Sequence, residues 1–400
     1  MPEKGLPKGI TKRSDGRYMG RFIYAGERYS LYDTNVKRLK KTMEDMRYEL
    51  EHGLYGKCEN VRLDKWFEEV IDVYKKPVLK ESTLIHYQVY YRLYIKKVLG
   101  NMYIKDIKPV HIQKLYNSMK ERGYKTNTIK KVANILRVTL EQAVRCDFIV
   151  KNPCVATTLP KADVKEKKIL TADEQKNFLE FVQNSKKWKH YYPLLLVGFG
   201  TGMRIGEILA LNWGDIDFAN GVIRVNKTLQ YLQSEVDKKC RYVIQTPKTS
   251  SSIRTIQMVP QIVDALKKHW EEQHTQIIYL GDAWQKHDEK LLRNLVFTTC
   301  FGNPVDRSSV NRTISKIIRD LNKEGEEKAK EENNQYVPIR DFTPHCMRHS
   351  FATRCFEAGI EPKIVQMYMG HSTVSVTMDI YTHVSEKGKK EEIKKIEKAV

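Results

Sequence analysis

The pattern of apolar and polar positions changes period several times along the 400 residues of this chain. Residues 10–33 alternate as strands do, with turns at Asp15-Gly16 and at residues 25–27. From residue 36 to residue 50 apolar residues recur at helical spacing, which predicts one helix packed on a small sheet. The other face of that sheet would present Arg17, Arg21 and Arg28. These side chains could enter a DNA groove or be merely solvated, and this segment alone does not decide between the two.

The next stretch, residues 58–160, is predicted to be all helical. Apolar residues recur at three- and four-residue spacing, Ser82-Thr83 opens one helix, and Pro109 suits the first position of another. The last helix of the stretch would turn an apolar stripe toward a bundle core. Its opposite side carries a basic ridge formed by Lys130, Lys131 and Arg137. Such a ridge faces either DNA or water, and the strong basic character of the segment favours DNA.

A Lys-rich stretch with few large apolar residues, 157–169, predicts a linker. Thr171 and Glu174 then form a capping box that opens a third region. That region is predicted to be helical to about residue 211, β-rich at 222–225, 242–245 and 254–258, and helical again to its end, with the charged stretch 322–335 as a mobile loop. The expected fold class is multidomain α+β. It comprises a three-stranded sheet plus helix (residues 1–57), a helical bundle (58–160) and a mostly helical domain with a small sheet (161–400).

Charge then narrows the possible partners. The chain has 70 Lys and Arg against 49 Asp and Glu, a net charge of +21. Residues 1–57 carry +5, residues 58–160 carry +9 and residues 161–400 carry +7. Two thirds of the excess therefore lies in the first two fifths of the chain, which is typical of modules that grip a polyanion.

Composition also excludes other classes of protein. The longest apolar stretch, around residues 191–199, is well short of the roughly 20 residues that span a bilayer, so no membrane segment is expected. The seven Cys are scattered and form no C-x-x-C pair, which argues against a disulfide framework or a zinc ribbon. A cytoplasmic protein is expected.

The glycines of residues 198–202 resemble a phosphate loop only superficially, because no Gly-Lys-Ser/Thr follows and the preceding run looks helical. They are predicted to turn the chain so that Arg204 begins the next helix. Arg204 and Glu207 are spaced i, i+3, which by itself suggests an ordinary surface ion pair. The strongly apolar residues 205–211 make a fully solvated Arg204 unexpected there.

His345 and His349 have the spacing of a zinc-binding helix, but Cys346 stands where such a helix has its glutamate, and Arg348 would bring a cation to the metal. Phosphate explains the stretch better. Thr343 and Pro344 predict a helix start, so that His345 and Arg348 lie in its first turn, where anions bind.

Two further residues extend this candidate phosphate site. His371 directly follows Gly370, which is predicted to end a helix beginning at Pro362. Tyr381 ends the next expected helical stretch, 372–381. A tyrosine at a helix end is usually a core residue, but a phenolate beside phosphate ligands could attack phosphorus and form a covalent intermediate.

Three segments resemble the signature boxes of the tyrosine recombinase, or phage-integrase-like, family: TGMRIGEILAL (201–211), TPHCMRHSFAT (343–353) and MGHSTVSVTMDIYTHV (369–384). The whole layout is similar to that of integrases from conjugative transposons. The resemblance implies that Arg204, His345, Arg348 and His371 surround the scissile phosphate and that Tyr381 is the nucleophile. It implies that Lys248 protonates the leaving 5′-oxygen, although Lys238 or Lys239 could be argued instead, and that Glu207 supports the site structurally.

The resemblance further implies a site-specific recombinase that integrates and excises a mobile element without metal, ATP or any other cofactor. Expected partners are double-stranded DNA, with arm-type sites bound by residues 1–57 and core-type sites by residues 58–160, and an accessory excision factor. A homotetramer is expected, with the tail 386–400 exchanged in trans, or else that tail is solvated. The alternatives are a type IB topoisomerase-like relaxing enzyme and a non-catalytic DNA-binding regulator.

Overall fold

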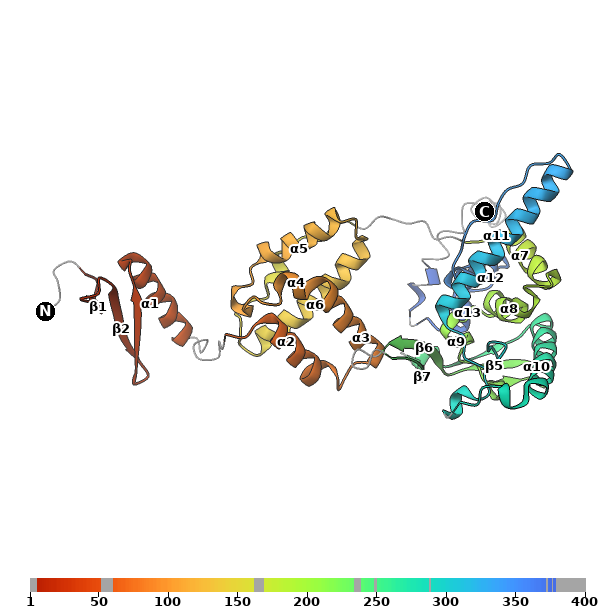
Figure 1. The fold of residues 1–400 in the computed structure, drawn as a ribbon, viewed down its shortest axis with the longest axis horizontal. Coiled ribbons are helices and arrows are strands. Elements are labelled where there is room, and N and C mark those ends of the chain that lie inside the picture. Colours follow the sequence, from red (N-terminus) through yellow and green to blue (C-terminus); the bar gives the residue numbers. More distant parts are fainter. Residues whose placement is uncertain are drawn as a thin grey trace, which may run out of the picture. The chain divides into compact units, whose positions relative to one another are not determined.

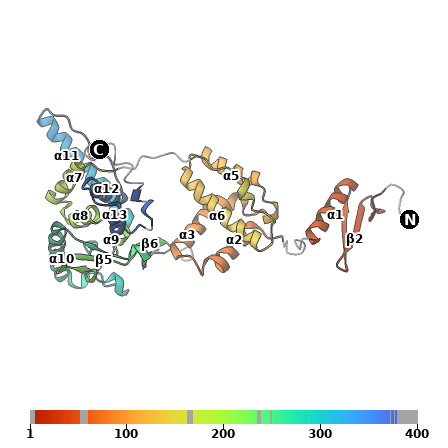
Figure 2. The same ribbon diagram turned by 180° about the vertical axis from the view of Figure 1, so that it is seen from behind.

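The computed structural model describes residues 6–51, 60–161, 169–233, 239–247, 250–287, 289–371, 373–375 and 377–378. The chain divides into two compact units, Met1–Val164 and Lys165–Val400 (Figures 1 and 2). A three-stranded sheet with one helix is followed by a run of helices, and then by helices interspersed with short strands. The expected multidomain α+β fold class is therefore confirmed. The three domain boundaries stay a prediction. None of the described helices combines the length and the apolar character that crossing a bilayer requires.

The first unit begins with a three-stranded antiparallel sheet and one helix, as the alternation predicts. Strands β1 (Ile10–Lys12), β2 (Tyr18–Tyr24) and β3 (Glu27–Asp33) are ordered β1-β2-β3, and α1 (Val36–Glu51) packs on them. Gly20 permits this close packing, because a side chain there would overlap the Met43 sulfur. The small core comprises Ile10, Phe22, Leu39, Met43 and Leu50.

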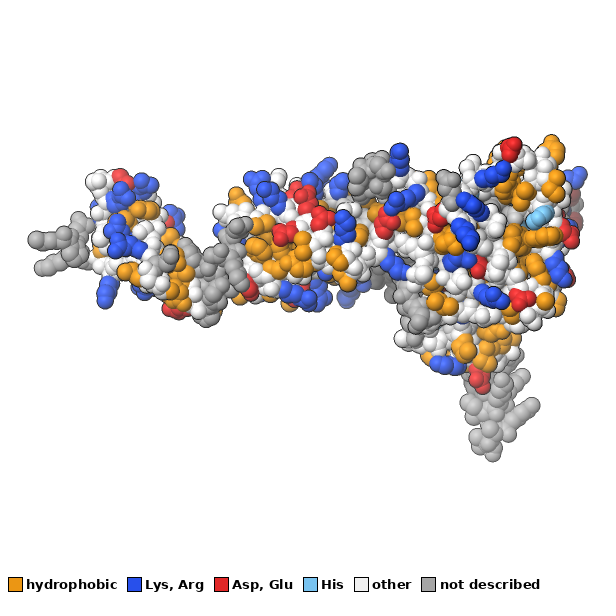
Figure 3. All heavy atoms as spheres, turned by 90° about the horizontal axis from the view of Figure 1, so that it is seen from below, with side chains coloured by type: hydrophobic (Ala, Val, Ile, Leu, Met, Phe, Trp, Pro, Cys, Tyr) orange, Lys and Arg blue, Asp and Glu red, His pale blue; other side chains and the backbone are white. Residues whose placement is uncertain are grey.

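Two of the three arginines predicted for the exposed face of this sheet lie on that face, and the third is held in a turn. Arg28 pairs with exposed Ile23 across β2 and β3, and Arg21 lies two residues before Ile23, so both arginines share the exposed face. Arg17 instead donates through Nη2 to Asp15 Oδ2 at 2.9 Å, within the turn. In the view of the whole chain in Figure 3, the Lys and Arg side chains of the described residues are spread over the surface with Asp and Glu side chains among them, rather than gathered in one basic patch.

The rest of the first unit is helical. Its helices are α2 (Leu63–Glu69), continued by the π-helical Val70–Lys75; α3 (Glu81–Tyr90), continued by the π-helical Tyr91–Ile95 and α4 (Lys96–Leu99); α5 (Pro109–Glu121); and α6 (Thr126–Arg145). Helix α3 begins one residue before the predicted Ser82. The stripe of α6 is buried as expected, and Lys130, Lys131 and Arg137 are exposed. The Lys131 ammonium lies 5.5 Å from the centre of the Tyr90 ring, a cation–π distance.

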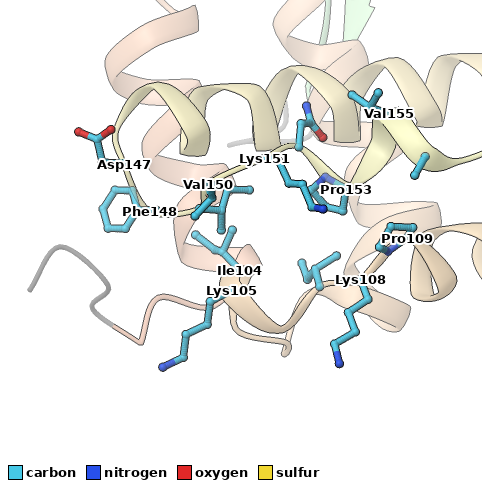
Figure 4. A pocket seen from close by; sticks show the side chains of 14 residues that line it. Ile104, Lys105, Lys108, Pro109, Asp147, Phe148, Val150, Lys151, Pro153 and Val155 are labelled. Atoms are coloured by element: carbon cyan, nitrogen blue, oxygen red, sulfur yellow. The ribbon is translucent and has the colours of Figure 1, made fainter. Parts of the chain in front are cut away.

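A cavity of about 550 Å³ lies between the 104–109 segment and the loop that follows α6. Its lining is mainly apolar, and in Figure 4 the long side chains of Lys105 and Lys108 extend away from it. The lining runs from Ile104 to Ala156 and includes none of the residues predicted to bind phosphate. This cavity is therefore not the predicted reaction site.

The second unit is built around the buried helix α8 (Tyr192–Thr201). Helices α7 (Ala172–Asn184), α10 (Pro260–Leu280) and α12 (Pro344–Glu357) pack against α8, and α13 (Pro362–Met369) packs on α12. The predicted capping box opens α7, with Glu174 N donating to Thr171 Oγ1 at 3.1 Å. One small sheet has the order β4-β5-β8 (Ile216–Asp217, Val222–Val225 and Arg254–Gln257), and β6 (Thr228–Gln233) pairs with β7 (Cys240–Gln245).

The glycines of residues 198–202 have two different roles, which corrects the prediction that all of them turn the chain. Gly198 and Gly200 lie inside α8, where a side chain would press on Met347 or Ile262 of neighbouring helices. Only Gly202 makes the turn, with φ +64°. Close helix packing, rather than turning, explains the first two glycines.

The charged stretch 322–335 is not a loop, and that prediction is wrong. Most of it forms the second half of α11 (Arg307–Glu331). Ion pairs at i, i+4 support this half, among them Lys328 Nζ to Glu324 Oε1 at 2.7 Å. Gly325 does not break the helix, because the Tyr336 ring occupies the place that a side chain at Gly325 would take.

Candidate active site

The turn between α8 and α9 (Ile205–Ile208) positions Arg204. A side chain at Gly202 would overlap the Phe351 ring, so glycine is required there. Arg204 is the N-cap residue of α9, as the turn predicts, and its backbone N donates to Glu207 Oε2 at 3.0 Å. Its Nη1 donates to Glu207 Oε1 at 2.8 Å. The Arg204 side chain remains 41% exposed, so a ligand can reach it.

Glu207 is buried and joins two arginines, unlike the surface ion pair that the spacing alone suggests. It is 4% exposed, and its Oε2 also accepts from Arg254 Nη2 at 2.9 Å. Burial would raise the pKa of Glu207, but Arg254 and Arg204 outweigh burial and hold that pKa below its usual value. Glu207 therefore stays ionised and fixes both guanidinium groups.

Three arginines bond to three successive carbonyls at the end of α13. Arg254 Nε donates to Tyr368 O at 2.5 Å, Arg348 Nη2 to Met369 O at 2.6 Å, and Arg204 Nη2 to Gly370 O at 3.4 Å. The last carbonyls of a helix lack partners within the helix and carry partial negative charge, so cations suit them. The end of α13 therefore gathers guanidinium groups from three distant parts of the chain.

Arg348 is the most buried of these cations. It is 1% exposed, and its Nη1 donates to Gly202 O at 2.7 Å. Burial, together with the charge of Arg204, lowers the pKa of Arg348 to about 9. Burial and the nearby Arg204 charge disfavour the Arg348 cation, so an anion that binds beside Arg348 would stabilise it. Among the residues that the structure describes, Glu207 is the one buried carboxylate that Arg204 and Arg254 contact, so this part of the site has an excess of positive charge.

His371 follows Gly370, which has φ +61° and ends α13 as predicted. Its Nδ1 lies 2.8 Å from Thr377 Oγ1, and its backbone N donates to Gln366 O at 3.2 Å. Burial, together with the charges of Arg348 and Arg204, lowers the pKa of His371 to about 3. His371 is therefore a neutral imidazole at pH 7, and its ring is oriented by Thr377.

His345 is exposed in the first turn of α12, which begins at Pro344 as predicted. Its ring meets that of His349 edge to face, with 4.5 Å between ring centres. His349 also contributes to the low pKa of His371, so the His349 ring lies near that of His371. Within the described residues, no group of three or more His, Cys, Asp or Glu is arranged to hold a metal ion.

Several predicted residues fall outside the described ranges: Lys248, Tyr381, the alternative lysine Lys238, and the tail 386–400. Lys239 is described and is exposed beside β7. Of the predicted set, the structure brings Arg204, Glu207, Arg348 and His371 together, with His345 on the same helix as Arg348. Arg254 was missed from the sequence, because no short-range pattern marks it.

The low pKa of His371 gives a pH-dependent stability. The unfolded chain binds a proton on this ring below about pH 6.5, its ordinary value, whereas the folded chain binds it only near pH 3. The unfolded state thus takes up more protons in this window, so the free energy of unfolding falls as pH drops below 6.5. We expect urea midpoints at pH 7.5 and 5.0 to differ less for His371→Gln than for the native chain. The exposed His274→Gln serves as control, and an unchanged difference in His371→Gln would contradict the assignment.

Two family models match this chain. The model of the phage integrase family covers residues 168–387, and that of the phage integrase N-terminal SAM-like domain covers residues 62–120. Among curated relatives, a XerC-like tyrosine recombinase of Caldanaerobacter subterraneus subsp. tengcongensis is 32% identical, over 90% of this chain and 89% of its own length. The transposase of transposon Tn916 from Enterococcus faecalis is 25% identical, over 98% of this chain and 95% of its own.

Among solved structures, the Tn1549 transposon integrase in complex with a circular intermediate DNA matches with a TM-score of 0.68 and 26% identity. The match covers 84% of this chain and 99% of that one. A lambda integrase dimer bound to a core site matches with a TM-score of 0.52 at 18% identity, a likeness of fold alone.

Proposed function

Because this chain belongs to the phage integrase family, and is therefore a tyrosine recombinase that cuts and rejoins DNA through a phosphotyrosine intermediate, we propose that its arginine cluster binds the scissile phosphate. In this proposal Tyr381 is the nucleophile. The enzyme integrates and excises a mobile element of the conjugative-transposon kind, an assignment supported by its similarity to the Tn916 transposase and the Tn1549 integrase.

One observation carries the assignment of the site, namely the three guanidinium groups held on successive carbonyls at the end of α13. Phosphoryl transfer demands little of a protein beyond positioning and neutralising the charge on the phosphate oxygens. Arg204 and Arg348 supply planar donors for those oxygens, and neutral His371 can add a further hydrogen bond. Since these groups are fixed before DNA binds, little reorganisation is needed in the transition state.

The proposed chemistry balances without an external energy source. The Tyr381 hydroxyl gives up its proton to water, and its oxygen forms a bond to phosphorus as the bond from phosphorus to the 5′-oxygen breaks, while Lys248 gives a proton to that departing oxygen. The phosphotyrosine bond keeps the energy of the cleaved linkage. A 5′-hydroxyl then attacks the phosphotyrosine, which frees the tyrosine and rejoins a strand. Neither ATP nor a metal is needed for these steps, and we assign no cofactor.

We assign DNA contacts to the two basic modules of the first unit. The Tn1549 integrase was solved with circular intermediate DNA and with transposon right end DNA, which supports double-stranded DNA as the partner of this chain. The helical module would grip core-type sites through Lys130, Lys131 and Arg137. The sheet would read arm-type sites through Arg21 and Arg28, with Arg17 released from Asp15. A cytoplasmic homotetramer that exchanges tails, joined by an accessory excision factor, completes the proposal.

The proposal is tested on a nicked, end-labelled core-site DNA, on which a recombinase is trapped after cleavage. We expect a covalent protein–DNA adduct at one position of element-end DNA, with the protein on the 3′-phosphate. Relaxation of supercoiled plasmid without sequence preference would instead indicate a topoisomerase-like enzyme. Site-specific binding with no adduct would indicate a DNA-binding regulator. Footprints of residues 1–57 within the full chain, with Arg21→Ala and Arg28→Ala as probes, would assign the arm sites.

A further inference from the structure

Arg254, the first residue of β8, has no part in the predicted site, yet it is among the most constrained cations of the second unit. Its side chain is 6% exposed. Each of its three nitrogens has a partner: Nη2 donates to Glu207 Oε2 at 2.9 Å, Nε to Tyr368 O at 2.5 Å, and Nη1 to Ser252 O at 3.1 Å. A guanidinium so occupied is held rigidly in its plane. It is suited to hold other groups in place rather than to receive a substrate.

The hydrogen-bond partners of Arg254 connect it to Arg204 and Arg348, the two arginines proposed to bind the phosphate. Through Glu207, whose other oxygen bonds to Arg204 Nη1 at 2.8 Å, Arg254 sets the position of the Arg204 fork. Through Tyr368 O it fixes the last turn of α13, where the next carbonyl, that of Met369, accepts from Arg348 at 2.6 Å. One side chain therefore constrains two guanidinium groups by two independent routes.

The packing around Gly370 tightens this arrangement. A Cβ atom at Gly370 would lie 3.2 Å from Arg254 Nη1 and 3.0 Å from Ser251 O. The backbone just before His371 therefore packs closely against both Arg254 and the short turn that precedes β8. Any movement of the Arg254 fork would move the helix end that carries the arginine-bonded carbonyls and His371.

We propose that Arg254 is a positioning residue, which aligns Arg204 and Arg348 on the scissile phosphate through Glu207 and the end of α13 without contacting the DNA itself. This inference rests on the proposed function of the site. It explains why a second cation, and a buried one, accompanies Glu207, which the more exposed Arg204 alone would suffice to neutralise. It also gives the acidic residue a defined task, to link a buried arginine to a substrate-facing one.

The test uses single-turnover cleavage of nicked core-site DNA by the full chain, at saturating DNA, with Arg254→Gln and Arg254→Lys. The amplitude of adduct formation reports the fraction of competent protein, and the rate constant reports alignment. We expect Arg254→Gln to slow the rate constant about 30-fold and Arg254→Lys about tenfold, because small misplacements of positioned groups are costly. DNA affinity should stay close to that of the native chain. The exposed Arg319→Gln is the matched control and should cleave normally.

A double-mutant cycle with Glu207→Gln tests the route. If Arg254 acts through Glu207, the double variant is little slower than the slower single variant; if the two defects multiply, that route is wrong. A fall in amplitude at an unchanged rate constant would overturn the proposal, since it would show a purely structural role. Native cleavage rates in Arg254→Lys would overturn it as well, because charge without the fork would then suffice. Should the native chain and Arg319→Gln both fail to form any adduct, the proposed function itself fails.

Discussion

Replacing Tyr381 by Phe is expected to abolish the covalent protein–DNA adduct. The change removes a single oxygen, the one that would bond to phosphorus, and leaves the ring in place. Removing the nucleophile from a covalent catalyst typically costs several orders of magnitude in rate, so adduct formation should fall by at least about 10⁴-fold. DNA affinity should be retained, because binding depends on many basic side chains rather than on one phenol. The measurement is the adduct band on nicked core-site DNA, beside a gel-shift titration of the same protein.

The matched control is Tyr279→Phe, which removes the same oxygen from an exposed tyrosine near the end of α10. That variant should form the adduct at the native rate. An adduct that persists in Tyr381→Phe would mean that another residue is the nucleophile. In that case mass spectrometry of the DNA-linked peptide would identify the residue. A nucleophile from another part of the chain would then have to reach the phosphate proposed to bind Arg204 and Arg348.

Much of the fold could be predicted from local pattern, because its elements follow strong local rules. The apolar stripe of α6, the capping box of α7 and the glycine ends of α8 and α13 each depend on residues within a few positions of one another. The stretch 322–335 was mispredicted since its acidic residues and Gly325 suggest a loop. The helix there is supported by Tyr336, which packs over Gly325 from the segment that follows α11, and by ion pairs along the helix. These contacts stabilise a helix in a stretch whose composition alone suggests a loop.

The residues of the candidate site likewise fall into two groups, those that short sequence motifs predict and those that only the folded structure reveals. Arg204, Arg348 and His371 belong to short motifs, so sequence reasoning could find them. Arg254 could not be found, because its partners Glu207 and Tyr368 lie 47 and 114 residues away and only folding brings them together. The buried state of Glu207 was missed for the same reason: a spacing of i, i+3 indicates that a pair can form, but not whether water surrounds it.

Arg348→Lys is expected to slow cleavage on the order of 10³-fold, although it keeps the positive charge. The Arg348 guanidinium bonds to Gly202 O at 2.7 Å and to Met369 O at 2.6 Å at once, and in the proposed function the same planar group also binds the scissile phosphate. A lysine ammonium is a single point of charge and cannot hold both carbonyls and a phosphate in that fixed plane. Arg204→Ala should cost about 10²-fold or more, since it removes a more exposed cation from the same phosphate.

The two variants should differ in stability, and this difference provides the control. Arg348→Ala would remove the guanidinium donor from two carbonyls of buried residues, Gly202 and Met369, so we expect the free energy of unfolding to fall by about 3 kcal/mol. Arg204→Ala should lower it less, because its side chain is 41% exposed. Single-turnover cleavage, DNA titration and urea unfolding of the same preparations separate the effects. If Arg348→Lys cleaved at the native rate, charge alone would suffice at this position, and the fork held between Gly202 and Met369 would have no role in the chemistry.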